Sequence, residues 1–349
     1  MKIKEFKDIC EVVGVSGYEE PTRKMIISQI KKHVDSVYTD NFGNVIAEKK
    51  GSKKGPKIMF AAHMDELGMV VTYVEKEGYI RFWKLGGIDT KILLDQNVIV
   101  HGKRPLPGVI AIKPPHLQKK EEVDKVVKKD ELFIDIGAKD KKEIEKLGID
   151  KGTVISFEPN FKELLNDTYC CKAVDNRAGV FTLLQTAKAL KKDFAGTVYF
   201  VFSTQEETGC KGSRTAAFRI NPDLALVVDV SNAGDNPYIK PIESEGALGK
   251  GVSITFMEAE GHGAIIPQKV RNFMVQSAKK AKVQYQIGMT QGGMTDAAAI
   301  QLIREGILAG VYGPPMRYMH STSGLIMKKD IESTIKYTLA LIKEAPKFF

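Results

Sequence analysis

Histidine and carboxylate side chains recur at the ends of apolar segments of this sequence. They are His63, Asp65 and Glu66 after KIMFAA, Asp175 directly before a helical segment, Glu206 and Glu207 after GTVYFVFSTQ, Asp229 after DLALVV, and His320 in a loop after ILAGVYG. Two His, two Asp and a Glu without thiolates suit a pair of divalent cations such as Zn²⁺, Co²⁺ or Mn²⁺. Such a pair would lower the pKa of a shared water and stabilise a tetrahedral intermediate, while a nearby carboxylate moves the proton. The doublet Glu206–Glu207 would supply one ligand and one general base, which requires it to lie in a loop where both side chains can face the centre.

Each of these residues has a common structural explanation when it is taken alone. An aspartate ahead of a helix is most often an N-cap, a glutamate doublet is usually solvated, and a histidine at a strand end is usually only hydrogen-bonded. However, the carboxyl ends of the strands in an open α/β sheet border one crevice. We therefore expect these side chains to converge on one rim of a sheet.

The elements that would position these residues follow from hydrophobic periodicity. A helix is predicted for residues 16–34, with Ser16 as its cap. Three strands are predicted next, at 36–40, 44–50 and 57–63, with residues 51–56 as the turn between the last two. The later predicted elements are a helix at 178–192, strands at 196–205 and 223–230, a helix at 272–282, a strand at 307–313 and a helix at 329–343.

Between about residues 70 and 164 the sequence consists of short alternating apolar segments separated by frequent Gly and Pro, which is typical of a small β domain. The charged segment 118–130 within it is predicted to be a mobile loop. The predicted fold class is therefore α/β, with a mixed sheet covered by helices on both faces. Residues 1–69 and 165–349 would form this domain, and residues 70–164 an inserted, β-barrel-like domain.

Composition excludes several classes of partner. No apolar run approaches the roughly 18 residues of a membrane helix, so we expect no membrane partner. The net charge of +9 comes from basic residues interspersed with acids, and the single Trp, Trp83, has no neighbouring basic run, so we expect no nucleic-acid partner. The amino terminus carries charges every few residues where an export signal needs an apolar core, which predicts a cytoplasmic location.

Six segments match one protein family in the same order: HMDELG, AVDNRAGV, QEETGCKGS, VVDV, GGMTDAAAI and RYMHS. They resemble the M42 metallo-aminopeptidases, whose archaeal members include the tetrahedral TET peptidases. The segments GVIAIKPPHL and LFIDIGA are similar to the insert of that family, so the resemblance covers almost the whole chain. It implies a zinc-peptidase α/β/α sandwich, an inserted dimerisation domain and dimers that assemble into a dodecamer. It also implies removal of amino-terminal residues from peptide substrates, with two Zn²⁺ or Co²⁺ ions per subunit.

The resemblance also implies a role for each matching residue. His63 and Asp229 would bind one metal, Glu207 and His320 the other, and Asp175 would bridge them. Glu206 would be the general base, which takes a proton from the bridging water and passes it to the leaving amine. Asp65 would accept a hydrogen bond from the far nitrogen of His63 and fix its tautomer. A cis peptide bond is implied between Asp175 and Asn176, and Glu66 receives no role.

Two features remain open at this point. The family commonly continues after RYMHS with Pro and an acid, whereas this chain has TSGLI at 322–326, so the support of the loop that carries His320 is in doubt. In GGMTDAAAI, either Gly292, Gly293 and Asp296 line the substrate pocket, or the segment is a strand-to-helix turn capped by Thr295 or Asp296.

The competing functions are other hydrolases on the same scaffold: a carboxypeptidase, a deacylase or an endoglucanase. An endoglucanase usually works through a pair of carboxylates without a metal, so chelation would separate it from a metallopeptidase. A nucleic-acid-binding protein is the alternative outside the enzymes, and the mixed-sign surface disfavours it.

Overall fold

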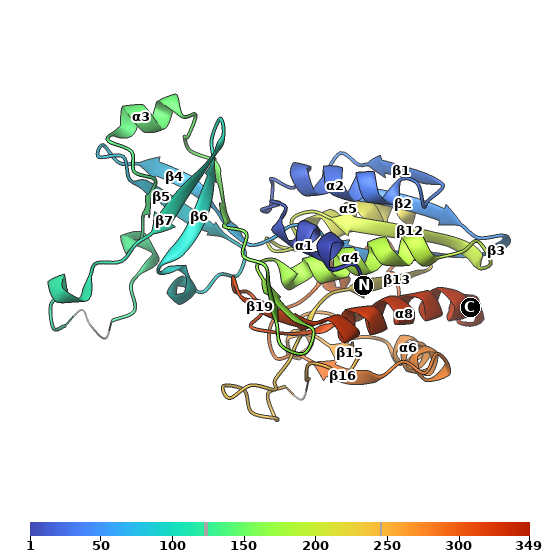
Figure 1. The fold of residues 1–349 in the computed structure, drawn as a ribbon. Coiled ribbons are helices and arrows are strands. Elements are labelled where there is room, and N and C mark those ends of the chain that lie inside the picture. The colour runs from blue at the N-terminus through green and yellow to red at the C-terminus, as the bar shows by residue number, and fades with distance from the viewer. Residues whose placement is uncertain (122–124, 245) are drawn as a thin grey trace.

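The computed structural model describes residues 1–121, 125–244 and 246–349, and the predicted mobile loop 118–130 therefore lies partly outside the described residues. The described chain forms a large mixed sheet covered by helices and, beside it, a small closed barrel (Figure 1). This arrangement confirms the predicted fold class. Within the described ranges, no helix combines the length and apolar composition needed to cross a membrane.

The main sheet has eight strands. Its spatial order is β1 (Ser36–Thr39), β2 (Val45–Lys50), β12 (Ala195–Ser203), β3 (Lys53–His63), β13 (Leu224–Val228), β17 (Ala309–Gly313), β15 (Val252–Met257) and β16 (Tyr285–Met289). The four central strands, β12, β3, β13 and β17, are parallel. Their carboxyl ends therefore meet at one edge of the sheet, where the candidate site residues follow them.

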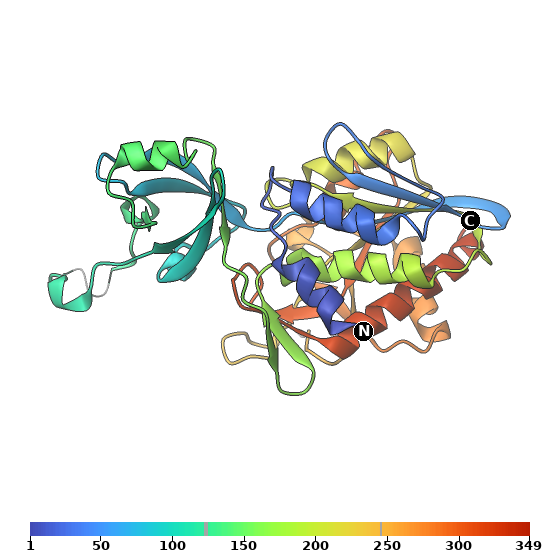
Figure 2. The same ribbon diagram turned by 45° about the horizontal axis from the view of Figure 1, so that its top comes forward.

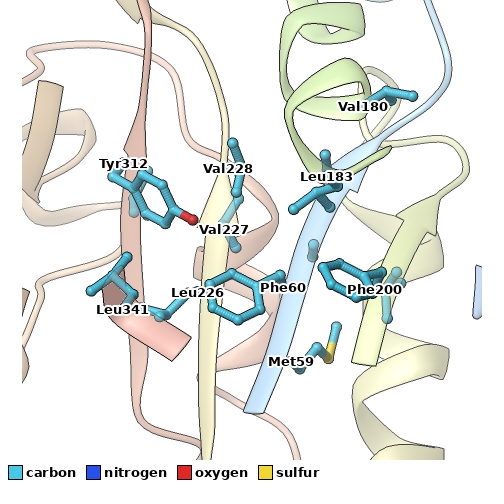
Figure 3. Close-up of a cluster of buried hydrophobic side chains, with 14 of the residues drawn as sticks. Met59, Phe60, Val180, Leu183, Phe200, Leu226, Val227, Val228, Tyr312 and Leu341 are labelled. Carbon is cyan, nitrogen blue, oxygen red and sulfur yellow. The ribbon is translucent and has the colours of Figure 1, made fainter. Parts of the chain in front are cut away.

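The central strands are buried on both faces, which explains their continuous apolar runs. In β3 every residue from Ile58 to His63 is buried. Phe60 of β3 packs in a cluster with Leu226 of β13 and Leu183 of α4 (Val174–Ala189), as Figure 3 shows. Each such buried side chain stabilises the fold by about 1.5–3 kcal/mol.

Helices cover both faces of the sheet because the chain crosses in both directions from its centre. The path from β3 through α4 leads to β12 on one side, whereas the path from β12 through α5 leads back past β3 to β13. Right-handed crossovers in opposite directions place their helices on opposite faces (Figure 2). The described α-helices outside the barrel are α1 (Ile3–Glu11), α2 (Glu20–Ile30), α4, α5 (Lys211–Ile220), α6 (Gln268–Lys280), α7 (Asp296–Ile300) and α8 (Lys328–Glu344).

The barrel closes on itself and has its own apolar core, made of residues between Met69 and Phe157. Its strands are β4 (Gly68–Val74), β5 (Ile80–Leu85), β8 (Ile134–Asp135), β7 (Pro105–Ile110), β6 (Gln96–His101) and β9 (Val154–Phe157), and it carries the helix α3 (Lys141–Lys146). The domain boundaries at 70 and 164 stay a prediction.

A second, five-stranded sheet is absent from the sequence-based prediction. Its order is β10 (Lys162–Leu164), β11 (Thr168–Cys171), β19 (Gly324–Met327), β18 (Pro315–Arg317) and β14 (Ser231–Asn232). These strands have two to four residues each, too few to produce a periodic pattern in the sequence.

Several predicted local features are wrong. Ser16 does not cap a helix, because α2 begins at Glu20 with Pro21 in its first turn, a position that suits proline. The predicted turn 51–56 is shorter, because β3 begins at Lys53, where backbone pairing with β12 extends the strand beyond its buried part. The helices α1 and α5, of nine and ten residues, are absent from the prediction.

Candidate active site

The predicted ligands come together at the carboxyl edge of the central strands. His63 is the last residue of β3, and Asp229 directly follows β13. The doublet Glu206–Glu207 lies beyond the end of β12 in a loop. This confirms the expectation that the doublet lies in a loop and not in the regular strand. Asp175 lies in a non-helical kink at the start of α4. The cis peptide bond between Asp175 and Asn176 is present.

The ligand atoms form two groups that share Asp175. His63, Asp175 and Asp229 make one group, and Asp175, Glu207 and His320 make the other. Asp175 Oδ1 lies 3.0 Å from His63 Nε2, while Asp175 Oδ2 lies 3.7 Å from His320 Nε2. The two oxygens of this carboxylate therefore face different groups.

The spacing within each group fits a small divalent cation. His63 Nε2 lies 3.9 Å from Asp229 Oδ1, and His320 Nε2 lies 3.6 Å from Glu207 Oε2. Tetrahedral Zn²⁺ ligands at about 2.0–2.2 Å from the metal lie about 3.4 Å from one another. Glu207 Oε1 is buried and has no hydrogen-bond partner among the described residues, so its lone pairs are not already used by a protein donor.

Both histidines have their second ring nitrogen held by a backbone carbonyl. His63 Nδ1 lies 3.2 Å from the carbonyl oxygen of Asp65 and 3.4 Å from its carboxylate Oδ1. His320 Nδ1 lies 3.0 Å from the carbonyl oxygen of Gly87, a residue just beyond barrel strand β5. An Nδ1–H donated to these oxygens leaves each Nε2 lone pair facing the acids.

The Asp65 carboxylate has contacts that the sequence did not reveal. Its oxygens accept hydrogen bonds from the backbone N–H groups of Glu206 at 2.9 Å and Glu207 at 3.2 Å, and from the hydroxyl of Ser16 at 2.5 Å. Asp65 therefore ties the loop of the glutamate doublet to the end of β3. No spacing in the sequence signals these contacts, because the partners lie 49 to 142 residues away.

Two asparagines fix other ligand segments. Asn176 Nδ2 donates to the carbonyl of Val228, next to Asp229, at 2.8 Å. Asn160 Nδ2 donates to the carbonyl of Thr322 at 2.7 Å, and Asn160 Oδ1 accepts from the N–H of Lys172 at 2.7 Å. The TSGLI segment after His320 is thus supported by an asparagine and by the pairing of β19 with β11.

A cavity of about 620 Å³ opens over the two groups, and its walls include Gly292, Gly293 and Thr295. Thr295 also caps α7 by accepting from the N–H of Ala297. Both alternatives for this segment therefore hold in part. Asp296 neither lines this cavity nor caps α7. It is buried, and its carboxylate accepts a hydrogen bond from Ser203 Oγ at 2.5 Å.

The comparisons with known proteins agree with this geometry. The model of the M42 glutamyl aminopeptidase family matches residues 43–337. The chain belongs to the M42 peptidase family. A lysyl aminopeptidase of Pyrococcus furiosus is 35% identical over 97% of this chain and 96% of its own length.

Solved structures of M42-like folds match equally well. An aminopeptidase from the archaeon Desulfurococcus kamchatkensis is 38% identical, with a TM-score of 0.94 over 99% of this chain and 96% of that one. The TET1 peptidase of Pyrococcus horikoshii, which can assemble into a tetrahedron or a large octahedral shell, is 33% identical, with a TM-score of 0.89 over 98% of this chain and 99% of that one. As an M42 member the chain is a metal-dependent aminopeptidase, a hydrolase of N-terminal peptide bonds.

Burial and mutual repulsion shift the protonation of this M42 centre. Burial raises the pKa of Glu206, Glu207 and Asp229 well above the usual range, and neighbouring carboxylates add to the effect. Burial opposes the charged form of His63, but the carboxylates of Glu206 and Asp229 outweigh it and raise the pKa of His63 well above 6.5. Protons therefore occupy the cluster until cations displace them.

These shifts predict how pH and metal act together on the stability of the M42 peptidase. A folded state that binds protons more tightly than the unfolded chain loses stability as pH rises, for a glutamate from its usual 4.5 upward and for His63 from 6.5 upward. We therefore expect Co²⁺ to raise the melting temperature more at about pH 8 than at about pH 6, since it replaces these protons. Calorimetry with EDTA and with Co²⁺ at both pH values measures this rise in melting temperature. Titrating groups away from the centre affect the EDTA and Co²⁺ samples equally, so their contribution cancels. An equal or larger rise at the lower pH would contradict the expectation.

The contacts of Asp65 predict a loss of activity in this M42 peptidase when its charge is removed. In Asp65→Asn one of the two glutamate N–H groups faces an amide N–H instead of an oxygen, so the doublet shifts. We expect kcat to fall by about 10- to 100-fold, the usual cost of losing a group that orients metal ligands. The matched control is Ser16→Ala, which removes only the hydroxyl donor to the same carboxylate. Steady-state kinetics that show equal, small effects for both variants would mean that Asp65 does not position the doublet.

Proposed function

We propose that this chain removes amino-terminal residues from peptides at a dinuclear metal centre. The observation that carries the proposal is the placement of Asp175, whose two carboxylate oxygens face two separate His–acid groups. His63 and Asp229 would hold one ion, Glu207 and His320 the other, and Asp175 would bridge them. Zn²⁺ or Co²⁺ suits this set of nitrogen and oxygen ligands.

Bound cations would lower the pKa of a shared water and stabilise the charge of the tetrahedral intermediate. The protein's own part is proton transfer by Glu206. This residue lies outside both ligand groups that contain His63 or His320, and its Oε2 is 3.9 Å from His63 Nε2. Its other oxygen, Oε1, accepts a hydrogen bond from Cys210 Sγ at 3.3 Å. Glu206 would take a proton from the attacking water and deliver it to the leaving amine.

The inserted barrel, residues 70–164, is proposed as the dimerisation domain, and the dimers are proposed to assemble into a dodecamer in the cytoplasm. Support comes from the similarity to the TET1 peptidase, which can assemble into a tetrahedron or a large octahedral shell. The barrel also exposes the large side chains of Tyr73 and Trp83, which a second subunit would cover. Sedimentation equilibrium of the purified chain measures the particle mass independently of its shape.

One experiment tests the proposed activity. A mixed peptide with a free amino terminus, and the same peptide acetylated, are incubated with chelated enzyme before and after Zn²⁺ or Co²⁺ is restored. Mass spectrometry should show stepwise, metal-dependent trimming of the free form alone. Loss from the carboxyl end would indicate a carboxypeptidase, and removal of the acetyl group a deacylase. Hydrolysis of a β-glucan in the presence of EDTA would indicate an endoglucanase.

A further inference from the structure

A buried ion pair joins the two chain segments that carry His63 and Asp175. Glu66 lies three residues after His63, and Lys172 lies three residues before Asp175. Lys172 Nζ donates to Glu66 Oε2 at 2.6 Å, and both side chains are at most 2% exposed. The resemblance of the sequence motifs to the M42 family gives Glu66 no role, and the proposed mechanism uses neither Glu66 nor Lys172.

The second oxygen of Glu66 is held from the opposite side. Glu66 Oε1 accepts from the N–H of Gly14 at 2.9 Å and lies 3.7 Å from Arg177 Nη2. Arg177 Nη1 in turn donates to the carbonyls of Ile9 at 2.7 Å and Val12 at 3.0 Å. The Glu66 carboxylate is thus fixed between the end of β3, the start of α4 and the segment after α1.

The ion pair directly borders the candidate metal centre. Glu66, Lys172, Asp175 and His320 together line one small cavity of about 20 Å³. The backbone of Lys172 is anchored to Asn160, which also holds the loop after His320. A change in the pair would therefore be transmitted to the bridging carboxylate and to both histidine segments.

Burial of such a pair is poorly explained by stability alone. Removing two charges from water costs about as much as their attraction returns, and apolar residues of the same volume often stabilise a fold equally well. A fixed geometry, in contrast, is what this site requires. Asp175 Oδ1 lies 3.0 Å from His63 Nε2, although the two residues are 112 positions apart and Glu207 and Asp229 repel Asp175.

We propose that the Glu66–Lys172 ion pair is a positioning device for the metal centre, which holds the His63 and Asp175 segments at the separation that lets both bind one cation. The inference rests on the proposed dinuclear function. Glu66 and Lys172 are positioning residues, because they act through His63 and Asp175 and not on the substrate.

The test compares Glu66→Gln and Lys172→Met with Lys49→Met. Lys49 is also a buried lysine of the α/β domain, 7% exposed, but its Nζ donates to the carbonyls of Ala187 and Leu190, away from the centre. The metal-free form of each full-length variant is titrated with Co²⁺, and the visible absorption of the bound ion is recorded. Thermal melts of the metal-free forms and values of kcat and KM with Co²⁺ at saturation complete the comparison.

We expect Co²⁺ affinity and kcat to fall by about 10- to 100-fold in both site variants, with an altered Co²⁺ spectrum and little change in KM. Lys49→Met should lower the melting temperature while it keeps the wild-type spectrum and kcat. Wild-type Co²⁺ affinity, spectrum and kcat in Glu66→Gln would overturn the inference. This variant decides the question even if Lys172→Met does not fold, because Gln keeps the shape of Glu and an acceptor for Gly14. If the wild-type chain binds no Co²⁺, this result would instead contradict the proposed function itself, and the inference with it.

Discussion

Replacement of Glu206 by Gln is expected to leave the fold and the bound metal in place while kcat falls by about 100- to 10,000-fold, the usual contribution of a general base. The amide keeps the shape of the side chain and can still accept from Cys210 Sγ. However, it cannot take a proton from the attacking water. Kinetics on a free-amino peptide, with metal content measured by mass spectrometry on the same samples, would test both halves of the prediction.

Glu344→Gln is the matched control for this variant. Glu344 is paired with Lys280 and Lys347 near the end of α8, away from the carboxyl edge of the sheet. The Glu344→Gln variant should retain wild-type kcat. This result would show that loss of a carboxylate away from the site does not lower kcat. If Glu206→Gln keeps more than about a tenth of the wild-type kcat, the general base is a different residue.

Replacement of Asp175 by Asn is expected to weaken both metal sites at once and to reduce peptide hydrolysis to near background. The reason is geometric: Oδ1 faces the group of His63, and Oδ2 faces the group of His320. An amide offers one neutral oxygen and one N–H group, so it cannot bridge two cations. Metal stoichiometry after gel filtration, together with Co²⁺ titration, measures the loss.

Asp229→Asn provides the comparison, because Asp229 belongs only to the group of His63. This variant should weaken the binding of one ion and retain the binding of the other. Equal losses of one ion in both variants would argue that Asp175 serves a single site. Two tightly bound ions in Asp175→Asn would show that the centre does not depend on a bridging carboxylate.

The sequence by itself determined where each candidate residue stands on its own element. Apolar runs long enough for buried strands end at His63, before the Glu206–Glu207 doublet and before Asp229, so these residues had to lie near strand ends. Parallel strands share one carboxyl edge, which made convergence on a rim predictable. The inserted barrel was visible too, because short alternating segments with Gly and Pro have a local signature.

Only the tertiary structure decided which side chains hold these residues in place. Asp65 accepts from the backbone of the glutamate doublet, Glu66 pairs with Lys172, and His320 contacts Gly87 beside the barrel. These partners are 106 to 233 residues apart along the chain. Periodicity and capping report on neighbours within a few turns of the chain, whereas such contacts depend on strand order and on the path of each crossover. For the same reason Ser16 was predicted to be a helix cap, and only the folded chain brings it to Asp65.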